Sequence, residues 1–179
     1  HRLAWPDSLR SYFDTGTSPL NPHTRAQSRF VYGTLPLWFL QALRTALNLQ
    51  DWADLFRAGR LLSALWATGT VLLLARLATQ FGSRAFAWFP ALWLALTPLC
   101  LQLSRFYTVD TAGAFFATAT LLLGVKALQR RNPGWLPAAG LCAGLAMACR
   151  LNLGLLLPWL LLVTASLKLR ARAPGIWPC

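Results

Sequence analysis

AFAWFPALWLALTPLCLQL (residues 85–103) and TAGAFFATATLLLGVKAL (residues 111–128) are two long apolar runs, separated only by SRFYTVD (residues 104–110). Each run is long enough to cross most of a bilayer as an α-helix, which needs about 20 residues. The short insert places Arg105 and Asp110 between them. Ionisable groups at such a position are expensive to keep, and they mark functional sites by default. We therefore expect a binding or catalytic site at this insert.

The composition extends the membrane interpretation to the whole chain. The 179 residues are 56% hydrophobic and 12% charged, whereas a soluble domain carries about 25% charged residues. The net charge is +12, from 17 Lys and Arg against five acidic residues. The basic residues fall between the apolar runs, as the positive-inside rule predicts. The sequence thus predicts a surface that faces membrane lipid, and it gives no reason to expect a nucleic-acid partner.

The predicted fold class is all-α, a polytopic membrane helical bundle with about five spanning helices plus an interfacial helix at about 33–49. Pro90 and Pro98 are expected to kink the second span. Gly140 and Gly144 have a small-xxx-small spacing, which predicts close helix contact. The five spans are expected at 59–80, 85–104, 110–128, 134–149 and 151–168.

Charge between the spans predicts their orientation. One side collects more Lys and Arg in short loops, so it is expected to be cytoplasmic. The other face then carries residues 1–58 as an extracytoplasmic loop, the 105–110 insert and Arg150. Residues 169–179 are expected to be a cytoplasmic tail. The chain has no start Met and ends abruptly, which favours a fragment cut at both ends. The predicted cytoplasmic set is Arg76, Arg84, Lys126, Arg130, Arg131, Lys168, Arg170 and Arg172.

Several ionisable residues from different helix ends meet on the predicted outer face. Guanidinium groups match phosphate oxygens through two parallel hydrogen bonds. A carboxylate nearby can hold a hydroxyl group, accept its proton or orient an arginine. Such a site suits the phosphate of a lipid whose tail lies between helices. The candidate residues are Arg60, Arg105, Asp110 and Arg150, with Asp14 in the upstream loop.

Each candidate has a simpler alternative. For Arg60 and Arg150, a side chain that only snorkels to the membrane interface is about as consistent with the sequence as a functional role. Arg105 and Asp110 are alternatively a structural ion pair that closes the loop. Asp14 lies in Asp-Thr-Gly and is alternatively a turn or cap residue. The cysteines form no CxxC motif and are interpreted as small buried hydrophobic residues, with no metal site; they are Cys100, Cys142, Cys149 and Cys179.

Four short motifs, in order, resemble glycosyltransferase family 39, which includes protein O-mannosyltransferases and the lipid A aminoarabinose transferase. YGTLPL (32–37) is similar to the family's PPL segment, with Leu35 in place of the first Pro. GRLLSAL (59–65) resembles its RlpSal helix start, and SRFYTVD (104–110) resembles its SRf…D loop. AGLAMACR (143–150) resembles its GLa…K segment, with Arg in place of the usual Lys.

The resemblance implies a GT-C fold and an integral membrane enzyme. Such an enzyme moves a sugar from a polyprenyl-phosphate carrier to an extracytoplasmic acceptor by inverting displacement. In the family, the general base belongs to an Asp-Glu pair after the first helix, which is expected upstream of His1 here. By position, Asp110 would orient acceptor or donor and Arg105 would support it. Arg60 would contact the carrier phosphate, as would Arg150.

The expected location is a bacterial inner membrane with the active site on its outer face. The chain has no Asp-x-Asp pair for a nucleotide-sugar metal, which agrees with a lipid-linked donor. No cofactor is identified, and a divalent metal stays open, as do the sugar and the acceptor. The alternative function is a lipid or solute transporter or flippase that binds the head group without chemistry. Against it, the sequence has no internal repeat, and its charges lie at helix ends.

Overall fold

The computed structural model describes residues 33–172, which are mostly helical and contain no strand. This arrangement confirms the predicted all-α class. The elements are α2 (Leu35–Ala46), α3 (Trp52–Ala78), α4 (Arg84–Leu96), α5 (Pro98–Arg105), α6 (Val109–Gln129), the 3-10 turn η2 (Pro133–Trp135), α7 (Leu136–Cys149), the 3-10 turn η3 (Leu151–Leu155) and α8 (Leu156–Arg172).

Three helical segments in the described part are long and apolar enough to cross a membrane, namely α3, α6 and Leu151–Leu169. The pair α4 and α5 passes the same test together, bent by 58°, so the number is four if the pair is one span. Pro133–Cys149, which contains η2 and α7, is a shorter apolar helix. The five predicted spans therefore correspond to five helical segments, of which three or four have the length of a span.

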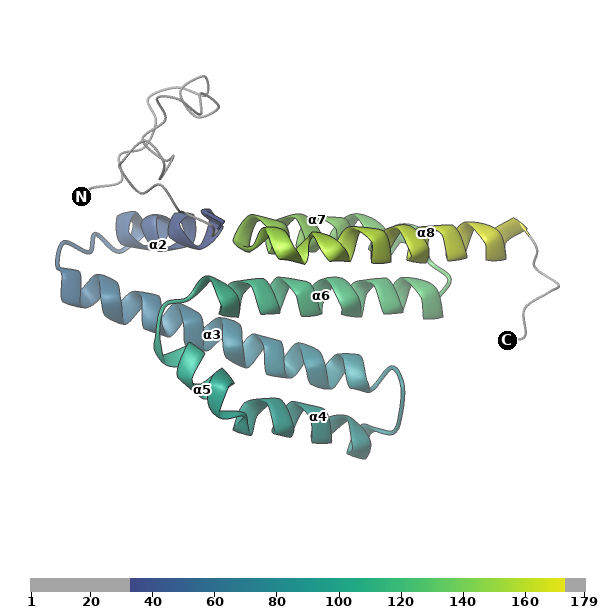
Figure 1. The fold of residues 1–179 in the computed structure, drawn as a ribbon, viewed down its shortest axis with the longest axis horizontal. Helices are drawn as coiled ribbons and strands as arrows, with labels where there is room; N and C mark the ends of the chain where they lie inside the picture. The colour runs from purple at the N-terminus through teal and green to yellow at the C-terminus, as the bar shows by residue number, and fades with distance from the viewer. Residues whose placement is uncertain (1–32, 173–179) are drawn as a thin grey trace, which may run out of the picture. The chain divides into compact units, whose positions relative to one another are not determined.

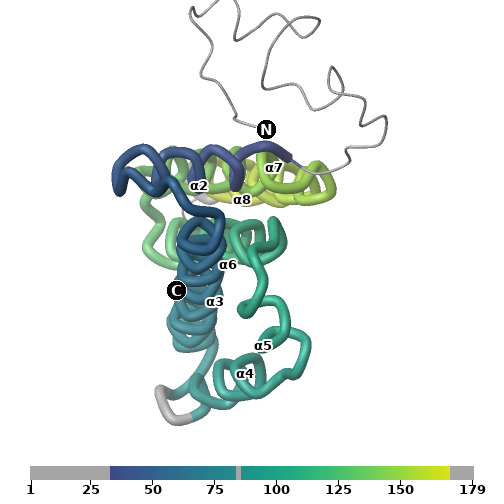
Figure 2. The backbone as a smooth tube through the Cα atoms, turned by 90° about the vertical axis from the view of Figure 1, so that its left-hand side faces the viewer, coloured from purple at the N-terminus to yellow at the C-terminus, as the bar shows by residue number. Residues whose placement is uncertain are grey.

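The helices form three layers. α3 and α6 lie side by side at the centre, with α2, α7 and α8 on one side and α4 and α5 on the other (Figures 1 and 2). The most extensive contacts join α6 with α7 and α3 with α6. α3 and α6 begin at the same end of the bundle, where α5 ends (Figure 1). This topology brings polar residues from distant parts of the sequence to one end.

Small residues form the contacts between helices. The core cluster contains Ala112, Phe116, Ala146 and Cys149. Trp66 of α3 packs against Phe116 with ring centroids 5.2 Å apart. Small residues at the interface let helix backbones approach closely, which is typical of membrane helices. Many large apolar side chains point outward instead, as expected for a lipid-facing surface; they include Leu61, Leu65, Leu72, Phe86, Trp93 and Leu141.

α3 begins earlier than the predicted span 59–80. Asp51 is its N-cap residue and Asp54 lies in its first turn. A carboxylate near a helix N-terminus interacts favourably with the helix dipole. Asp54 also pairs with Arg57 at 3.3 Å. The acidic segment that looked like a loop is therefore the first turn of the helix.

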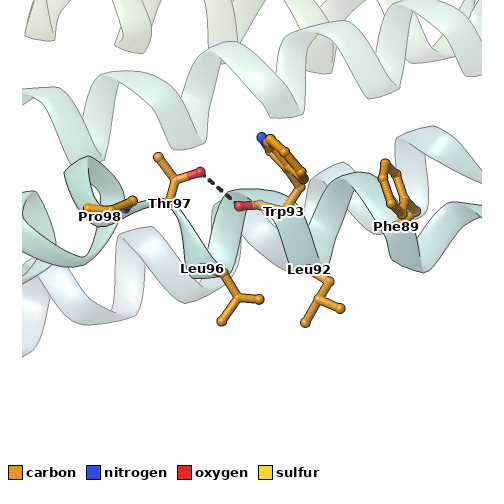
Figure 3. A pocket seen from close by; sticks show the side chains of 6 residues that line it. All are labelled: Phe89, Leu92, Trp93, Leu96, Thr97 and Pro98. Carbon is orange, nitrogen blue, oxygen red and sulfur yellow. Dashed lines mark hydrogen bonds between the residues drawn. The ribbon is translucent and has the colours of Figure 1, made fainter.

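The predicted span 85–104 is broken at Thr97, which ends α4 and precedes Pro98. A proline disfavours helical conformation in the residue before it, and Thr97 has φ −66° and ψ 121°. The kink expected at Pro98 is thus confirmed, whereas Pro90 lies inside α4 without ending it. The Thr97 hydroxyl donates to the Trp93 carbonyl at 2.8 Å, beside an apolar pocket of about 390 Å³ (Figure 3).

The expected helix contact at Gly140 and Gly144 is wrong. A Cβ atom at either position would meet nothing within 4 Å, since both glycines lie on the exposed face of α7. The buried face carries Ala139 and Ala143 instead. The close approach occurs at Gly124 of α6, where a Cβ atom would lie 2.1 Å from the Trp159 ring of α8. The spacing indicated small residues but did not show which face is packed.

Candidate functional site at the start of α3 and α6

The insert between α5 and α6 is anchored by its central tyrosine. The Tyr107 hydroxyl donates a hydrogen bond to the carbonyl oxygen of Pro36 in α2. The ring covers Gly59 of α3, where a Cβ atom would lie 3.1 Å from the tyrosine side chain. Burial, and to a lesser extent the neighbouring Cys149, raises the pKa of Tyr107. The hydroxyl is therefore a neutral donor at physiological pH.

A second anchor lies one turn further along α3. Ser63 is fully buried. Its hydroxyl oxygen accepts hydrogen bonds from the Thr108 backbone N–H at 3.4 Å and from the Thr111 hydroxyl at 3.3 Å. Gly59 and Ser63, four residues apart on one helix face, thus position the insert on α3. The side-chain oxygen of Thr108 is buried without a hydrogen-bond partner among the described residues.

Arg60 follows Gly59 and, because successive helical residues are about 100° apart, faces a different side. It lines a groove of about 490 Å³ between α3 and α5. Arg105, the last residue of α5, lines the same groove, and both side chains are exposed. We name this the arginine groove; its lining residues are Arg57, Arg60, Leu61, Ala64, Ser104 and Arg105. The structure therefore brings together two of the predicted site residues.

Arg57 is a groove residue that the sequence interpretation missed. It lies three residues before Arg60, and residues at this spacing are neighbours on a helix surface. The signal was present in the sequence, but α3 was expected to begin only at residue 59. The Arg57 guanidinium forms an ion pair with the Asp54 carboxylate at 3.3 Å. Arg60 lies over the Phe56 ring, 6.0 Å from its centroid.

Asp110 does not pair with Arg105, so the ion pair considered from the sequence is wrong. The carboxylate of Asp110 instead accepts a hydrogen bond from the guanidinium of Arg150. Asp110 lies in the first turn of α6, and Arg150 is the C-cap residue of α7. The ion pair therefore joins the start of one helix to the end of another, at the end of the bundle where the arginine groove lies.

Asp110 also lines a small cavity. The cavity has a volume of about 180 Å³ and lies between α3, α4, α5 and α6. Its walls are almost entirely apolar, because the hydroxyl groups of Thr70 and Thr97 donate to backbone carbonyls of their own helices. The Asp110 side chain is 32% exposed and that of Arg150 is 42% exposed. Asp110 is thus in contact with Arg150 and lines an apolar cavity at the same time.

A comparison with known protein families identifies the family of this chain. The family model described as dolichyl-phosphate-mannose-protein mannosyltransferase matches residues 35–177. The chain belongs to this family. No curated protein sequence and no solved structure matches the chain. The family assignment confirms the resemblance to protein O-mannosyltransferases, and it makes the chain part of a multi-pass membrane protein of glycosyltransferase type.

In this mannosyltransferase-family chain, the four quoted motifs have structural roles at the same end of the bundle. The Gly33 backbone N–H donates to the Cys149 carbonyl at 2.9 Å. This contact joins the YGTLPL segment to AGLAMACR, while Tyr107 joins SRFYTVD to both α2 and the GRLLSAL segment.

The predicted candidate Asp14 lies outside the described residues. Within residues 33–172, no three His, Cys, Asp or Glu side chains are grouped as metal ligands.

Proposed function

We propose that this protein transfers a sugar from a polyprenyl-phosphate carrier to an acceptor on the outer face of a bacterial inner membrane. The observation that carries the proposal is the arginine groove, which gathers three exposed guanidinium groups beside a lipid-facing helix. The family assignment supports glycosyl transfer as the chemistry. A lipid-linked donor would explain why a strongly cationic groove lies at the end of an apolar bundle.

The groove has the chemistry of a phosphate site. Arg60 and Arg105 have no ion-pair partner among residues 33–172, and Arg57 has only the exposed Asp54. Arginine forks bind phosphate oxygens bidentately. In the reaction, the bond between the anomeric carbon and the carrier phosphate breaks, and the phosphate leaves with the electron pair. Cationic groups placed at the developing charge stabilise this transition state.

An apolar stripe offers a place for the carrier tail. Leu61 lines the groove, and Leu65 and Leu72 follow it on α3 at helical spacing. Their exposed fractions are 68%, 68% and 56%. A chain bound by its phosphate at Arg60 would thus lie along a mainly apolar face of α3, on which the Thr68 hydroxyl donates to the Ala64 carbonyl. This arrangement favours a long isoprenoid carrier over a water-soluble sugar phosphate.

Asp110 is proposed as a positioning residue. The Arg150 guanidinium donates a hydrogen bond to its carboxylate, and the side chain also lines the small cavity between α3, α4, α5 and α6. We infer that Asp110 orients the acceptor or donor, and that Arg150 holds Asp110 and adds positive charge near the carrier phosphate. A general base takes the proton from the acceptor hydroxyl. The hydroxyl oxygen then attacks the anomeric carbon with inversion.

The test is an assay of the whole protein in proteoliposomes with a radiolabelled polyprenyl-phosphate sugar. Arg60→Ala should lower sugar transfer by about 100-fold, because removing one group that stabilises transition-state charge costs about this much. Asp110→Asn should lower it by about the same factor, because misplacing a reactant by about 1 Å has a similar effect. Arg76→Ala, near the other end of α3, should retain wild-type transfer. Wild-type activity in Arg60→Ala and Asp110→Asn would contradict the proposed roles. Carrier binding without sugar release in the wild-type protein would instead support the transporter alternative.

A further inference from the structure

The end of the bundle opposite the arginine groove carries a cluster of two cations on one indole ring. The Lys126 ammonium lies 5.5 Å from the Trp135 ring centroid, and the Arg130 guanidinium carbon lies 5.8 Å from it. Lys126 and Arg130 are four residues apart near the end of α6, and Trp135 belongs to η2. We name these three residues the basic tryptophan cluster. The side chain of Arg130 is exposed, and those of Lys126 and Trp135 are half-buried.

The positive charge of this cluster has no ion-pair partner within residues 33–172. The carboxylates within residues 33–172 are Asp51, Asp54 and Asp110, and all lie at or near the start of α3 or α6. Neither Lys126 nor Arg130 forms an ion pair in the described part of the chain. Like charges four residues apart on a helix repel each other. An anion shared by the two side chains would remove this repulsion.

The turn after α6 holds the indole in place. Arg131 has φ 49°, which ends the helix in a left-handed conformation. The side chain of Asn132 then accepts a hydrogen bond from the Gly134 backbone N–H at 2.8 Å. The chain therefore turns back, and Trp135 lies against the last turns of α6. The turn therefore fixes the position of Trp135 in the backbone, and the side chains of Lys126 and Arg130 lie over its ring.

We propose that the basic tryptophan cluster binds the phosphodiester head group of an anionic phospholipid. Its place at the end of an apolar helix corresponds to the head-group level of a bilayer, where tryptophan is enriched. Basic clusters at this depth bind anionic lipid head groups. The acyl chains would lie against the exposed apolar face of α7, which carries Leu141 at 67% exposure. Free phosphate would supply the charge but would leave this apolar face uncovered.

The test uses the whole protein in a nonionic detergent, with bound lipid counted by native mass spectrometry. We expect phosphatidylglycerol to bind in preference to phosphatidylcholine. The double variant Lys126→Gln with Arg130→Gln should weaken phosphatidylglycerol binding by about tenfold or more. The charge-conserving double variant Lys126→Arg with Arg130→Lys should retain binding, which separates loss of charge from loss of folding. Inorganic phosphate at equal concentration should not displace the lipid.

A matched control removes two charges elsewhere on the same expected membrane face. Arg76 and Lys168 are both exposed, and neither is one of the two cations over the Trp135 ring. Arg76→Gln with Lys168→Gln should therefore retain most phosphatidylglycerol binding. Equal loss in both glutamine pairs would show only a diffuse positive field and would overturn the site. Equal binding of phosphatidylglycerol and phosphatidylcholine, or displacement by phosphate, would overturn it as well.

Discussion

The hydroxyl of Tyr107 donates a hydrogen bond to the backbone carbonyl of Pro36, a residue 71 positions earlier in the chain. On the same segment, the Gly33 N–H donates to the Cys149 carbonyl at 2.9 Å. A Cβ atom at Gly33 would lie 1.8 Å from the Ala148 carbonyl oxygen, so the two backbones are in direct contact. The start of α2 is thereby held by both the α5–α6 insert and the end of α7.

The Tyr107 contact predicts a stability effect. Tyr107→Phe would leave the Pro36 carbonyl without this donor, which should lower the free energy of unfolding by about 1–3 kcal/mol. Thermal unfolding of the purified protein in detergent measures the change. Phe106→Leu is the matched control, since Phe106 is 54% exposed and should be nearly neutral. An unchanged midpoint in Tyr107→Phe would show that the hydrogen bond contributes nothing to stability.

The ion pair of Asp110 and Arg150 predicts coupling between the two positions. Asp110→Asn or Arg150→Gln alone breaks the ion pair and keeps one of its two charges. The double variant removes both charges, so it should be more stable than the sum of the single losses predicts, by about 1 kcal/mol. Thermal unfolding of the four proteins gives this coupling energy. Strictly additive losses would mean that the two side chains do not interact in the protein.

Two glycines of adjacent helices should respond in opposite directions to the same substitution. Gly124→Ala should destabilise the protein by about 1–3 kcal/mol, because the new methyl group would overlap the Trp159 ring. Gly140→Ala meets open space and should stabilise α7 by about 0.5–1 kcal/mol. Resistance to unfolding by sodium dodecyl sulfate distinguishes the two. A stabilising effect at both positions would mean that α6 and α8 are not in close contact.

Arg57 should act mainly in binding of the lipid-linked donor. Arg57→Ala removes one of the three guanidinium groups of the arginine groove and should raise KM for the donor about tenfold while kcat changes less. Asp54→Asn is the informative companion, because it removes the carboxylate that pairs with Arg57 at 3.3 Å. It should leave KM unchanged or lower it. A higher KM in Asp54→Asn would show that the ion pair itself is needed.

Much of this arrangement could be predicted from composition and periodicity. The apolar runs predicted the helical segments, and Pro98 predicted the break because its effect on Thr97 is local. Arg60 and Arg105 were expected on one membrane face, and the structure places both in one groove. The successes for the helical segments share a cause: hydrophobic length and proline geometry act through local sequence.

The rest depended on which helix faces meet. From the sequence, Asp110 could have paired with Arg105 or with Arg150. The packing of α6 against α7 brings Arg150, and not Arg105, to Asp110. The same holds for the glycines, because spacing alone does not show that Gly124 and not Gly140 is packed. Arg57 was missed for a different reason, since the acidic first turn of α3 looked like a loop. Interhelical contacts between distant residues leave little trace in a single sequence.

The contacts that hold the start of α2 can form only late in the synthesis of the protein. α2 is made before the other described helices, but Tyr107 and Cys149, which hold its start, are made much later. At ordinary elongation rates the delay to Cys149 is on the order of ten seconds. Until Phe116 is made, Trp66 of α3 is the only one of these two aromatic side chains that can pack against Phe39 of α2. In a nascent chain released or paused before residue 149, α2 would lack its contact with Cys149 and would be exposed to chaperones and membrane proteases.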